Sequence, residues 1–600
     1  FNVAGTGTLN LINQGVLQVM ANAGTPGAGV AFLETQHTAG SARVALDSSS
    51  GTVQIGPNAI FELYRGSSAG TVSATVSGGL DVASTGTLRA WGADLAVTAQ
   101  PAGFSVDGML QVKDGTTTLN VGTLTPTIGA LRLEGGSLFL SGTGTGALHT
   151  NAFTQTSGTL SNPLVLSLNG GSLASTHIWS GGTITGGGTL AVPGSLSLSP
   201  LYAATLQSQT LKVQSAGVVD LSGQVYQPSG TSTVQVDTGG ALRLALPAGS
   251  GDVGFTAAGS GTLTVNNEGL MQVWGSKVSP STGVAFLEST GANSLLTFTS
   301  NTGTLEVGQL NGPATLQVYR GHLAGPATST ISGSLTVGAG SRLWAAADSL
   351  SVTATPGAFN FAGTLKVTNG ATNFNIGTLS PTLEGLQLGG GTLTLAGTGA
   401  ASLSTNALAL TAGTLSNPLT LTLNGGAGST THAWSGGRVE GAGTLLLSPS
   451  GSLALNHPEM AGQTLQLGSN SATTVQGYGL YANGTNAIRI EPGALLTLDN
   501  QGSVNSFTEL IKANSGTLSI SNSGTLRSIG AGLSQVGAQV GGTTVYTSDA
   551  GSAVQVQAGT LQLTDYGYTG TGVGQFTLAG TLSISTGATL ENSGAPVSYT

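Results

Sequence analysis

The chain has 600 residues, of which 98 are Gly, 19 are Pro and none is Cys, and its net charge at pH 7 is −9. Only 6% of the residues are charged, compared with about 25% in an average soluble domain. These values exclude a collagen-like chain, a disulfide scaffold and Cys-ligated metal sites. No basic cluster could neutralise nucleic-acid phosphates, and no apolar run is long enough for a membrane-spanning helix. Hydrophobic residues reach 39%, too many for a disordered Gly/Ser tract.

The first segment, 1–254, is predicted to consist of short strands. Gly-x-Leu followed by alternating apolar and polar residues recurs at Gly86, Gly108, Gly136 and Gly158, often about 22 residues apart. Alternation of period two puts Leu and Val on one face of a strand and Thr or Ser on the other. Gly lies between the strands, where turns need positive φ or a close backbone approach. No long segment has a helical period with a convincing N-cap. The pattern therefore predicts an all-β fold.

The second segment, 255–508, repeats the first. Gly29–Glu34 recurs unchanged as Gly283–Glu288, 254 residues later, and Gly158–Leu164 matches Gly413–Leu419. The sequence also pairs Trp91 with Trp344, Arg89 with Arg342 and Asp94 with Asp348, whereas Glu62 becomes Gln317, Asp107 becomes Ala362 and Asp114 becomes Asn369. Similarity at a fixed period indicates tandem units of about 254 residues.

The last segment, 509–600, is predicted to be a partial, divergent third unit. Ser515–Ile520 resembles Ser260–Val265, and the similarity then weakens. Because the repeat starts at the first residue and stops within a unit, we expect these 600 residues to be part of a longer array of such units.

Short strands, Gly corners and a period of roughly 20 residues predict one long parallel β-helix, or β-solenoid, in which each coil buries its apolar face against its neighbours. The alternative is a string of β-sandwiches, which also contain many short strands. Only 5% of the residues are aromatic, whereas sandwich cores are expected to contain individual aromatic residues at irregular spacing. This difference favours the solenoid.

With its Gly-Thr-Leu strands and the related segments Trp179–Val192 and Trp434–Leu447, the chain resembles β-strand-repeat surface proteins of Gram-negative bacteria, of the filamentous-haemagglutinin and autotransporter-passenger type. The resemblance covers nearly the whole chain and is compositional. It implies a right-handed parallel β-helix, export to the cell surface or the extracellular space, and a role in adhesion, biofilm or fibre formation. Proteins of that type also have an N-terminal secretion domain and a C-terminal membrane barrel, and neither is expected within these 600 residues.

The sequence predicts no catalytic, cofactor-binding or metal-binding residues. Polysaccharide cleavage by carboxylates requires an acid paired with a base or nucleophile, and the repeats share few charges. The candidate contact residues are aromatic and recur in both repeats. They pack in the core or at corners, or else they stack on carbohydrate or contact a neighbouring fibre. They are Tyr64, Trp91, Trp179, Tyr319, Trp344 and Trp434. His177 and His432 each precede a Trp by two residues and are expected to be packed or capping residues.

The sequence therefore predicts a secreted, non-enzymatic structural or adhesive fibre protein that associates with copies of itself and contacts surface glycans or other cells. A sparsely charged surface lacks the repulsion that normally prevents lateral association. The alternative is a polysaccharide-binding or polysaccharide-cleaving β-helix. That alternative predicts a cluster of charged residues in one repeat that the other repeat lacks.

Overall fold

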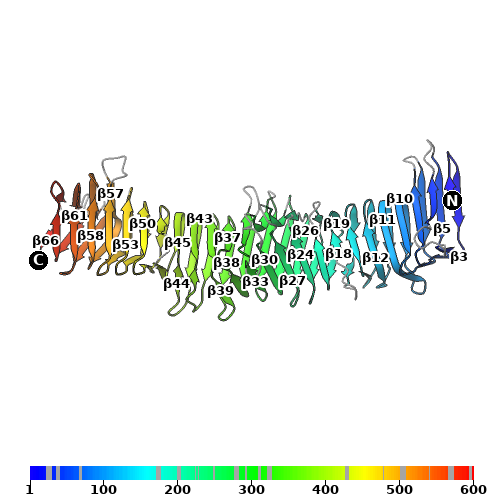
Figure 1. Ribbon diagram of the computed structural model, residues 1–600, viewed down its shortest axis with the longest axis horizontal. Helices are drawn as coiled ribbons and strands as arrows, with labels where there is room; N and C mark the ends of the chain where they lie inside the picture. The colour runs from blue at the N-terminus through cyan, green and yellow to red at the C-terminus, as the bar shows by residue number, and fades with distance from the viewer. Residues whose placement is uncertain are drawn as a thin grey trace. The chain divides into compact units, whose positions relative to one another are not determined.

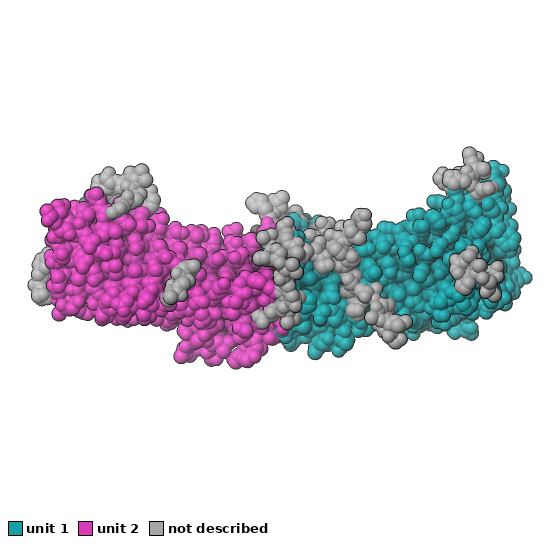
Figure 2. Space-filling model, viewed as in Figure 1, with its two compact units in different colours: residues 1–305, 320–327 teal, residues 306–319, 328–600 magenta. Residues whose placement is uncertain are grey.

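The computed structural model divides into two compact units (Figure 2). Unit 1 comprises Phe1–Leu305 and Arg320–Ala327, and unit 2 comprises Glu306–Tyr319 and Thr328–Thr600. The described residues are 1–600 except 22–29, 36–40, 67–69, 170–176, 199–203, 223–224, 227–228, 247–250, 258, 276–282, 291–292, 309–311, 321–326, 426–430, 478, 501–507, 539–540, 565–572, 594–596 and 600. The repeat boundaries after residues 254 and 508 are independent of this division and remain predictions from the sequence.

Unit 1 is built from parallel strands (Figure 1), and along most of it a strand pairs with the third strand that follows it. One such row is formed by β17 (Val165–Leu168), β20 (Thr189–Val192), β23 (Thr210–Val213), β26 (Thr231–Val236), β29 (Thr262–Asn267) and β32 (Leu295–Ser300). Three strands thus make one coil, and the next coil adds one strand to each row. The chain winds in this way because a parallel neighbour can be reached only through a crossover connection.

Unit 2 follows the same rule. One of its rows contains β44 (Ser402–Thr405), β46 (Thr420–Leu423), β49 (Thr444–Leu447), β52 (Thr464–Leu467) and β55 (Asn486–Ile490). The pairings along this row are parallel. Among the described residues there are strands and no helix. The predicted all-β fold is confirmed. The parallel ladders are consistent with a β-solenoid and differ from the antiparallel sheets of β-sandwiches.

The core of each unit consists of apolar side chains stacked from coil to coil. In strands such as β23 and β46 alternate residues are buried, as the period-two pattern predicts. In unit 1 one buried stack contains Leu190, Leu211, Val234, Val265 and Phe298. In unit 2 a corresponding stack contains Leu403, Leu421, Leu445, Leu465 and Ile488. Such stacks remove apolar surface from water at about 25 cal/mol per Å², and this burial holds the coils together.

Buried polar groups satisfy one another in matching ways in both units. Nδ1 of His177 accepts a hydrogen bond from the backbone N–H of Phe153 (3.0 Å), and Nε2 lies 3.0 Å from the carbonyl oxygen of Asn169. His432 makes the same two contacts with the N–H of Leu408 (3.0 Å) and the carbonyl of Asn424 (2.8 Å). Because Nδ1 accepts, the proton resides on Nε2 and is donated to the carbonyl.

A second matching device is a buried amide pair that spans two coils. Nε2 of Gln209 donates to the carbonyl of Asn162 (2.7 Å), and Nε2 of Gln463 donates to the carbonyl of Asn417 (2.8 Å). Each Asn side chain returns a hydrogen bond to its Gln at 3.3 Å. All these side chains are almost fully buried. Their role is to satisfy backbone groups at the corner of the coil.

Candidate functional site

A row of outward side chains on unit 2 brings together charged, polar and aromatic residues. The row lies on β45 (Leu408–Ser416), β48 (Arg438–Glu440), β51 (Glu459–Ala461) and β54 (Leu480–Asn483). Strand register places Thr414, Arg438, Glu459 and Tyr481 directly beside one another, 24, 21 and 22 residues apart in sequence. Because their neighbours along the strands face the core, these side chains face solvent.

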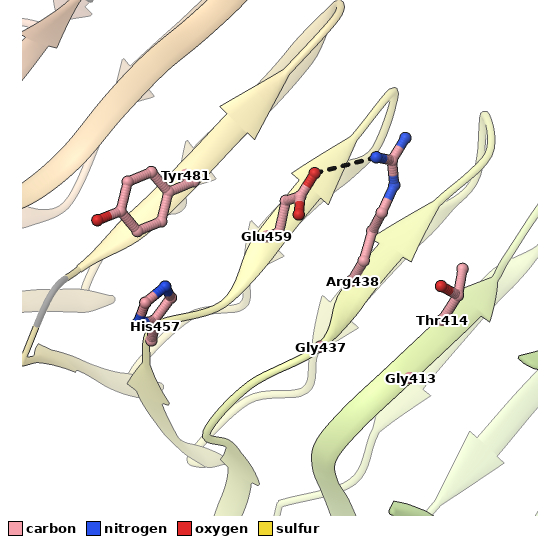
Figure 3. A pocket seen from close by; sticks show the side chains of 7 residues that line it. All are labelled: Gly413, Thr414, Gly437, Arg438, His457, Glu459 and Tyr481. Carbon is pink, nitrogen blue, oxygen red and sulfur yellow. Dashed lines mark hydrogen bonds and ion pairs between the residues drawn. The ribbon is translucent and has the colours of Figure 1, made fainter. Parts of the chain in front are cut away.

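These residues line a hollow of about 570 Å³ (Figure 3). The other lining residues are Gly413, Gly437 and His457. Both glycines have positive φ, 83° and 74°, and a Cβ on Gly437 would come within 2.6 Å of the Gly413 carbonyl oxygen. The floor beside Thr414 and Arg438 is therefore bare backbone, because only glycine fits there.

Charge in this region is concentrated around one guanidinium group. Arg438 binds Glu459 through Nη1 at 3.0 Å and Glu440 through Nε at 2.9 Å. Nδ2 of Asn483 also donates to Glu459 at 2.6 Å. The Arg438 side chain is 41% exposed, so part of the guanidinium remains open to solvent. One cation thus faces two carboxylates, and the cluster carries a net negative charge.

At the other end of the hollow lie two rings. The centroids of His457 and Tyr481 are 5.2 Å apart, with the ring planes inclined by 37°. The backbone of His457 lies in the left-handed region, with a φ of 63°, immediately before Pro458. This conformation is uncommon for a residue other than Gly. It places the exposed imidazole next to the half-buried phenol ring (Figure 3).

The corresponding row of unit 1 has the same backbone without the charges. Thr159 pairs with Thr183, and Thr183 pairs with Thr205. Gly158 and Gly182, which correspond to Gly413 and Gly437, also have positive φ, 79° and 84°. Thr183 and Thr205 therefore stand where unit 2 has Arg438 and Glu459. The charged cluster on this row therefore occurs in unit 2 and not in unit 1.

Two of the predicted contact residues, Trp179 and Trp434, are core residues. Their exposed fractions are 1% and 0%. His177 and His432 are also fully buried, as expected for packed corner residues. Burial lowers the pKa of both imidazoles below the usual value, and their hydrogen bonds to backbone carbonyls oppose this shift only in part. These four residues are not accessible to a ligand.

Tyr64 and Trp91 lie together on the surface of unit 1. They occupy paired positions on β7 (Ile60–Arg65) and β10 (Thr87–Thr98), with ring centroids 4.8 Å apart, and Nζ of Lys113 lies 3.7 Å from the Trp91 ring centroid. Beside them runs a hydrogen-bonded ladder of side chains from successive coils. Arg89 binds Glu62 and Gln111, each at 2.7 Å, and Gln111 binds Glu134 at 2.9 Å.

In unit 2 the equivalent surface is arranged differently. Tyr319 is half-buried on β34 (Thr315–Arg320), and Trp344 on β37 (Arg342–Ala346) is paired with Lys366, whose Nζ lies 3.8 Å from the indole centroid. Trp344 pairs with Gln317 in the way that Arg89 pairs with Glu62. The sequence-based pairings of Trp91 with Trp344 and of Arg89 with Arg342 are therefore wrong by two residues.

The pairing of Asp94 with Asp348 is also wrong. Leu95 and Leu350 occupy matching positions, so that Asp94 corresponds to Ser349 and Ala93 to Asp348. Asp94 is exposed, whereas Asp348 is 3% exposed. A displacement of one residue exchanges the two faces of a strand. This explains why the side chain of Asp94 points outward and that of Asp348 points inward.

Asp348 is an isolated buried carboxyl group. Neither of its oxygens makes a hydrogen bond of normal geometry with a described residue. Burial raises the pKa of Asp348 to about 7, although its own backbone N–H and the nearby Ser329 hydroxyl lower it in part. The carboxyl is therefore partly protonated near neutral pH.

The sequence did not identify Arg438, His457, Glu459 or Tyr481 as candidates. A signal was present, because Arg438 and Glu440 replace Thr183 and Thr185 within the otherwise similar segments around Trp179 and Trp434. In unit 1, Asp107, Lys113 and Asp114 do not form a charged cluster of this kind. Lys113 covers Trp91, and both aspartates are exposed.

In the part of the chain that the structure describes, no group of three His, Asp or Glu residues could hold a metal ion. The same residues include no helix long and apolar enough to cross a membrane. No model of a known protein family matches the sequence, and no curated protein matches it.

Proposed function

We propose that the protein is an extracellular structural or adhesive β-solenoid that associates with copies of itself into a surface filament or biofilm-matrix fibre. In this proposal the coils form a right-handed helix built from tandem units of about 254 residues. The protein acts by its shape and surface and not as an enzyme. Its place is the cell surface, or the medium around it, of a Gram-negative bacterium.

The observation that supports this proposal is an uninterrupted hydroxyl row on unit 1. Five threonines, which we call the hydroxyl row, are in register on successive strands and face outward. They are Thr189, Thr210, Thr233, Thr264 and Thr297. Unit 2 has a shorter row of the same kind, Ser402, Thr420, Thr444 and Thr464. Charged side chains on a protein surface keep copies of a protein apart, and these rows carry none.

Electron microscopy and sedimentation of the purified protein at increasing concentration test the proposal. We expect filaments or bundles whose mass grows with concentration. Replacing Thr210, Thr233 and Thr264 by Lys adds three like charges to the hydroxyl row, and we expect this variant to remain as single particles at low salt. Salt screens repulsion between exposed charges, so assembly should return as ionic strength rises.

The matched control replaces the same three threonines by Asn, which is polar and uncharged. It should assemble like the unmodified protein if charge is the decisive property. A chain that stays as single particles at every concentration would contradict the proposal.

A further inference from the structure

We propose that the hollow over β45, β48, β51 and β54 of unit 2 binds a neutral saccharide. The inference goes beyond the scaffold role and does not depend on self-association. It gives the polysaccharide-binding alternative a site and a ligand class. The hollow, at about 570 Å³, falls within the range of about 300–1,000 Å³ that is usual for small-ligand sites.

The charges of the hollow argue against an ionic ligand. Arg438 is already bound by Glu440 and Glu459, so an incoming phosphate, sulfate or uronate would meet two carboxylates around one guanidinium. Like charges at such short range repel strongly in a partly desolvated site. A metal cation would compete with Arg438 for the same carboxylates. The cluster therefore favours an uncharged ligand.

The hydrogen-bonding groups match hydroxyls. Glu459 accepts hydrogen bonds, the exposed part of the Arg438 guanidinium donates them, and the hydroxyl of Thr414 can do either. A sugar hydroxyl donates and accepts at once, so neighbouring hydroxyls can bind both a carboxylate and the guanidinium. Hydrogen bonds to charged groups are the stronger kind. The cluster is held in place by Asn483 and by its own ion pairs before any ligand arrives.

The two rings supply the other half of the recognition. A pyranose has an apolar face of C–H groups, and Tyr481 beside His457 offers an aromatic surface at the end of the polar row. Tyrosine combines such a surface with a polar hydroxyl. Thr414 and Tyr481 are separated by three strand spacings, about 14 Å. A short oligosaccharide lying across the strands would therefore contact the polar cluster and the rings together.

The experiment is a binding screen of the full chain against an immobilised panel of neutral and uronate-containing oligosaccharides, followed by calorimetry on the best ligand. We expect neutral oligosaccharides to bind. The variant Arg438→Thr/Glu440→Thr/Glu459→Thr should bind at least tenfold more weakly, and Tyr481→Ala should show a loss of similar size. Unit 1 has threonine at the positions of all three replaced residues, Thr183, Thr185 and Thr205, so the strand pairing is expected to survive.

The matched control is Glu62→Gln/Arg89→Gln, which removes an ion pair from unit 1. Its affinity should equal that of the unmodified chain. Thermal unfolding of every variant verifies that it is folded. The proposal is overturned if no neutral oligosaccharide binds, if uronate ligands bind more tightly, or if the triple variant binds as well as the original. Filaments seen by microscopy in the absence of sugar binding would overturn this inference alone and leave the scaffold role intact.

Discussion

A row of strands in unit 1 and the matching row in unit 2 have similar inward-facing side chains and different outward-facing ones. The inward positions hold Leu160, Ile184 and Leu206 in unit 1 and Leu415, Val439 and Met460 in unit 2, all of them buried. The matching outward positions hold Thr159, Thr183 and Thr205 in unit 1 but include Arg438 and Glu459 in unit 2. The comparison teaches that register is set by the apolar stacks. Outward side chains can then change without moving the backbone, because solvent accommodates them.

Position 348 is the exception to this rule. Its side chain points inward, yet Ala93 in unit 1 is replaced there by an acid in unit 2, and both residues are buried. Burying an unpaired charge is unfavourable unless the group becomes neutral. The difference therefore makes the stability of unit 2 depend on a proton at a position where unit 1 has no titratable group.

The largest expected effect is that of replacing Asp348 by Ala, the residue of unit 1. The folded-state pKa is raised to about 7, so the folded chain holds its proton more tightly than the unfolded chain does. The unmodified chain therefore has its full stability below the unfolded-state pKa of Asp348, and it loses stability as the pH rises through 7. A shift of about three pKa units corresponds to about 4 kcal/mol.

We therefore expect Asp348→Ala to be more stable than the unmodified chain at pH 8–9 and to lose this advantage by pH 4. Hydrogen exchange of the amides of β38 (Ser349–Thr353) would measure the effect locally. Asp348→Asn, which keeps the shape and removes the charge, is the control and should behave like the Ala variant. Parallel pH profiles for the original chain and both variants would contradict the prediction.

The second effect concerns His177 in unit 1 and His432 in unit 2. We expect their replacement to destabilise the two units equally. Replacing either by Leu leaves one backbone N–H and one carbonyl buried without a partner, at a cost of about 3 kcal/mol. Burial lowers the pKa of both imidazoles. Their contribution to stability is therefore fully present above the unfolded-state pKa and is lost as pH falls through the folded-state pKa.

Hydrogen exchange of β15 (Phe153–Gln155) and β45 would compare the two sites within one molecule. We expect the same increase in exchange at each site in its own variant. We also expect the loss of stability on acidification below about pH 6.5 to disappear there. Unequal losses at the two sites would mean that the shared hydrogen bonds do not have the same energetic role.

The third effect tests the buried amide pairs. Gln463→Leu removes the hydrogen bond to the Asn417 carbonyl, and Gln209→Leu removes the equivalent bond to Asn162. Each variant also loses the hydrogen bond that the Asn side chain donates to the Gln, whereas each Asn carbonyl still accepts one from the backbone N–H of Gly188 or Gly443. With two hydrogen bonds lost, we expect a cost of about 2 kcal/mol in each variant. Chemical denaturation of the single and double variants would measure it. Because the two sites lie far apart in the chain and share no partner, the losses should add.

The alternation of Leu with Thr allowed the all-β fold and the inward faces of the strands to be predicted. Strands such as Thr210–Val213 and Thr420–Leu423 have the expected buried and exposed positions. The buried roles of His177 and His432 were also anticipated. These features depend on local pattern, and the local pattern of a strand is set by its own pleat.

The hollow of unit 2 could not be predicted in this way. Arg438 and Glu459 touch because they lie on neighbouring coils, 21 residues apart, while other neighbouring coils of the protein differ by more than 30 residues, as between Thr264 and Thr297. Without the length of each coil, the sequence does not say which outward residues meet. The same uncertainty of one or two residues misplaced Trp344 and Asp348. Register, and not composition, was the missing information.

The smallest effect is expected from Glu62→Gln, which gives unit 1 the residue that unit 2 has at Gln317. Glu62 and Arg89 form an ion pair at 2.7 Å with side chains 12% and 25% exposed. The amide can still accept a hydrogen bond from Arg89, so only the charge is lost. Ion pairs near the surface contribute about 1 kcal/mol or less, and we expect a loss of that size that shrinks at high salt.

A double-mutant cycle with Arg89→Gln separates the pair from its surroundings, since Arg89 also binds Gln111 at 2.7 Å. In unit 2, Gln317 and Trp344 occupy the positions of Glu62 and Arg89, and the strand register is maintained without an ion pair. A coupling energy below about 1 kcal/mol would mean that unit 1 does not need the pair for its register either. A coupling of several kcal/mol would mean that unit 1 uses this ladder to fix its register. The apolar stacks would then not be sufficient in unit 1, and the outward rows of the two units would differ in structural role as well as in chemistry.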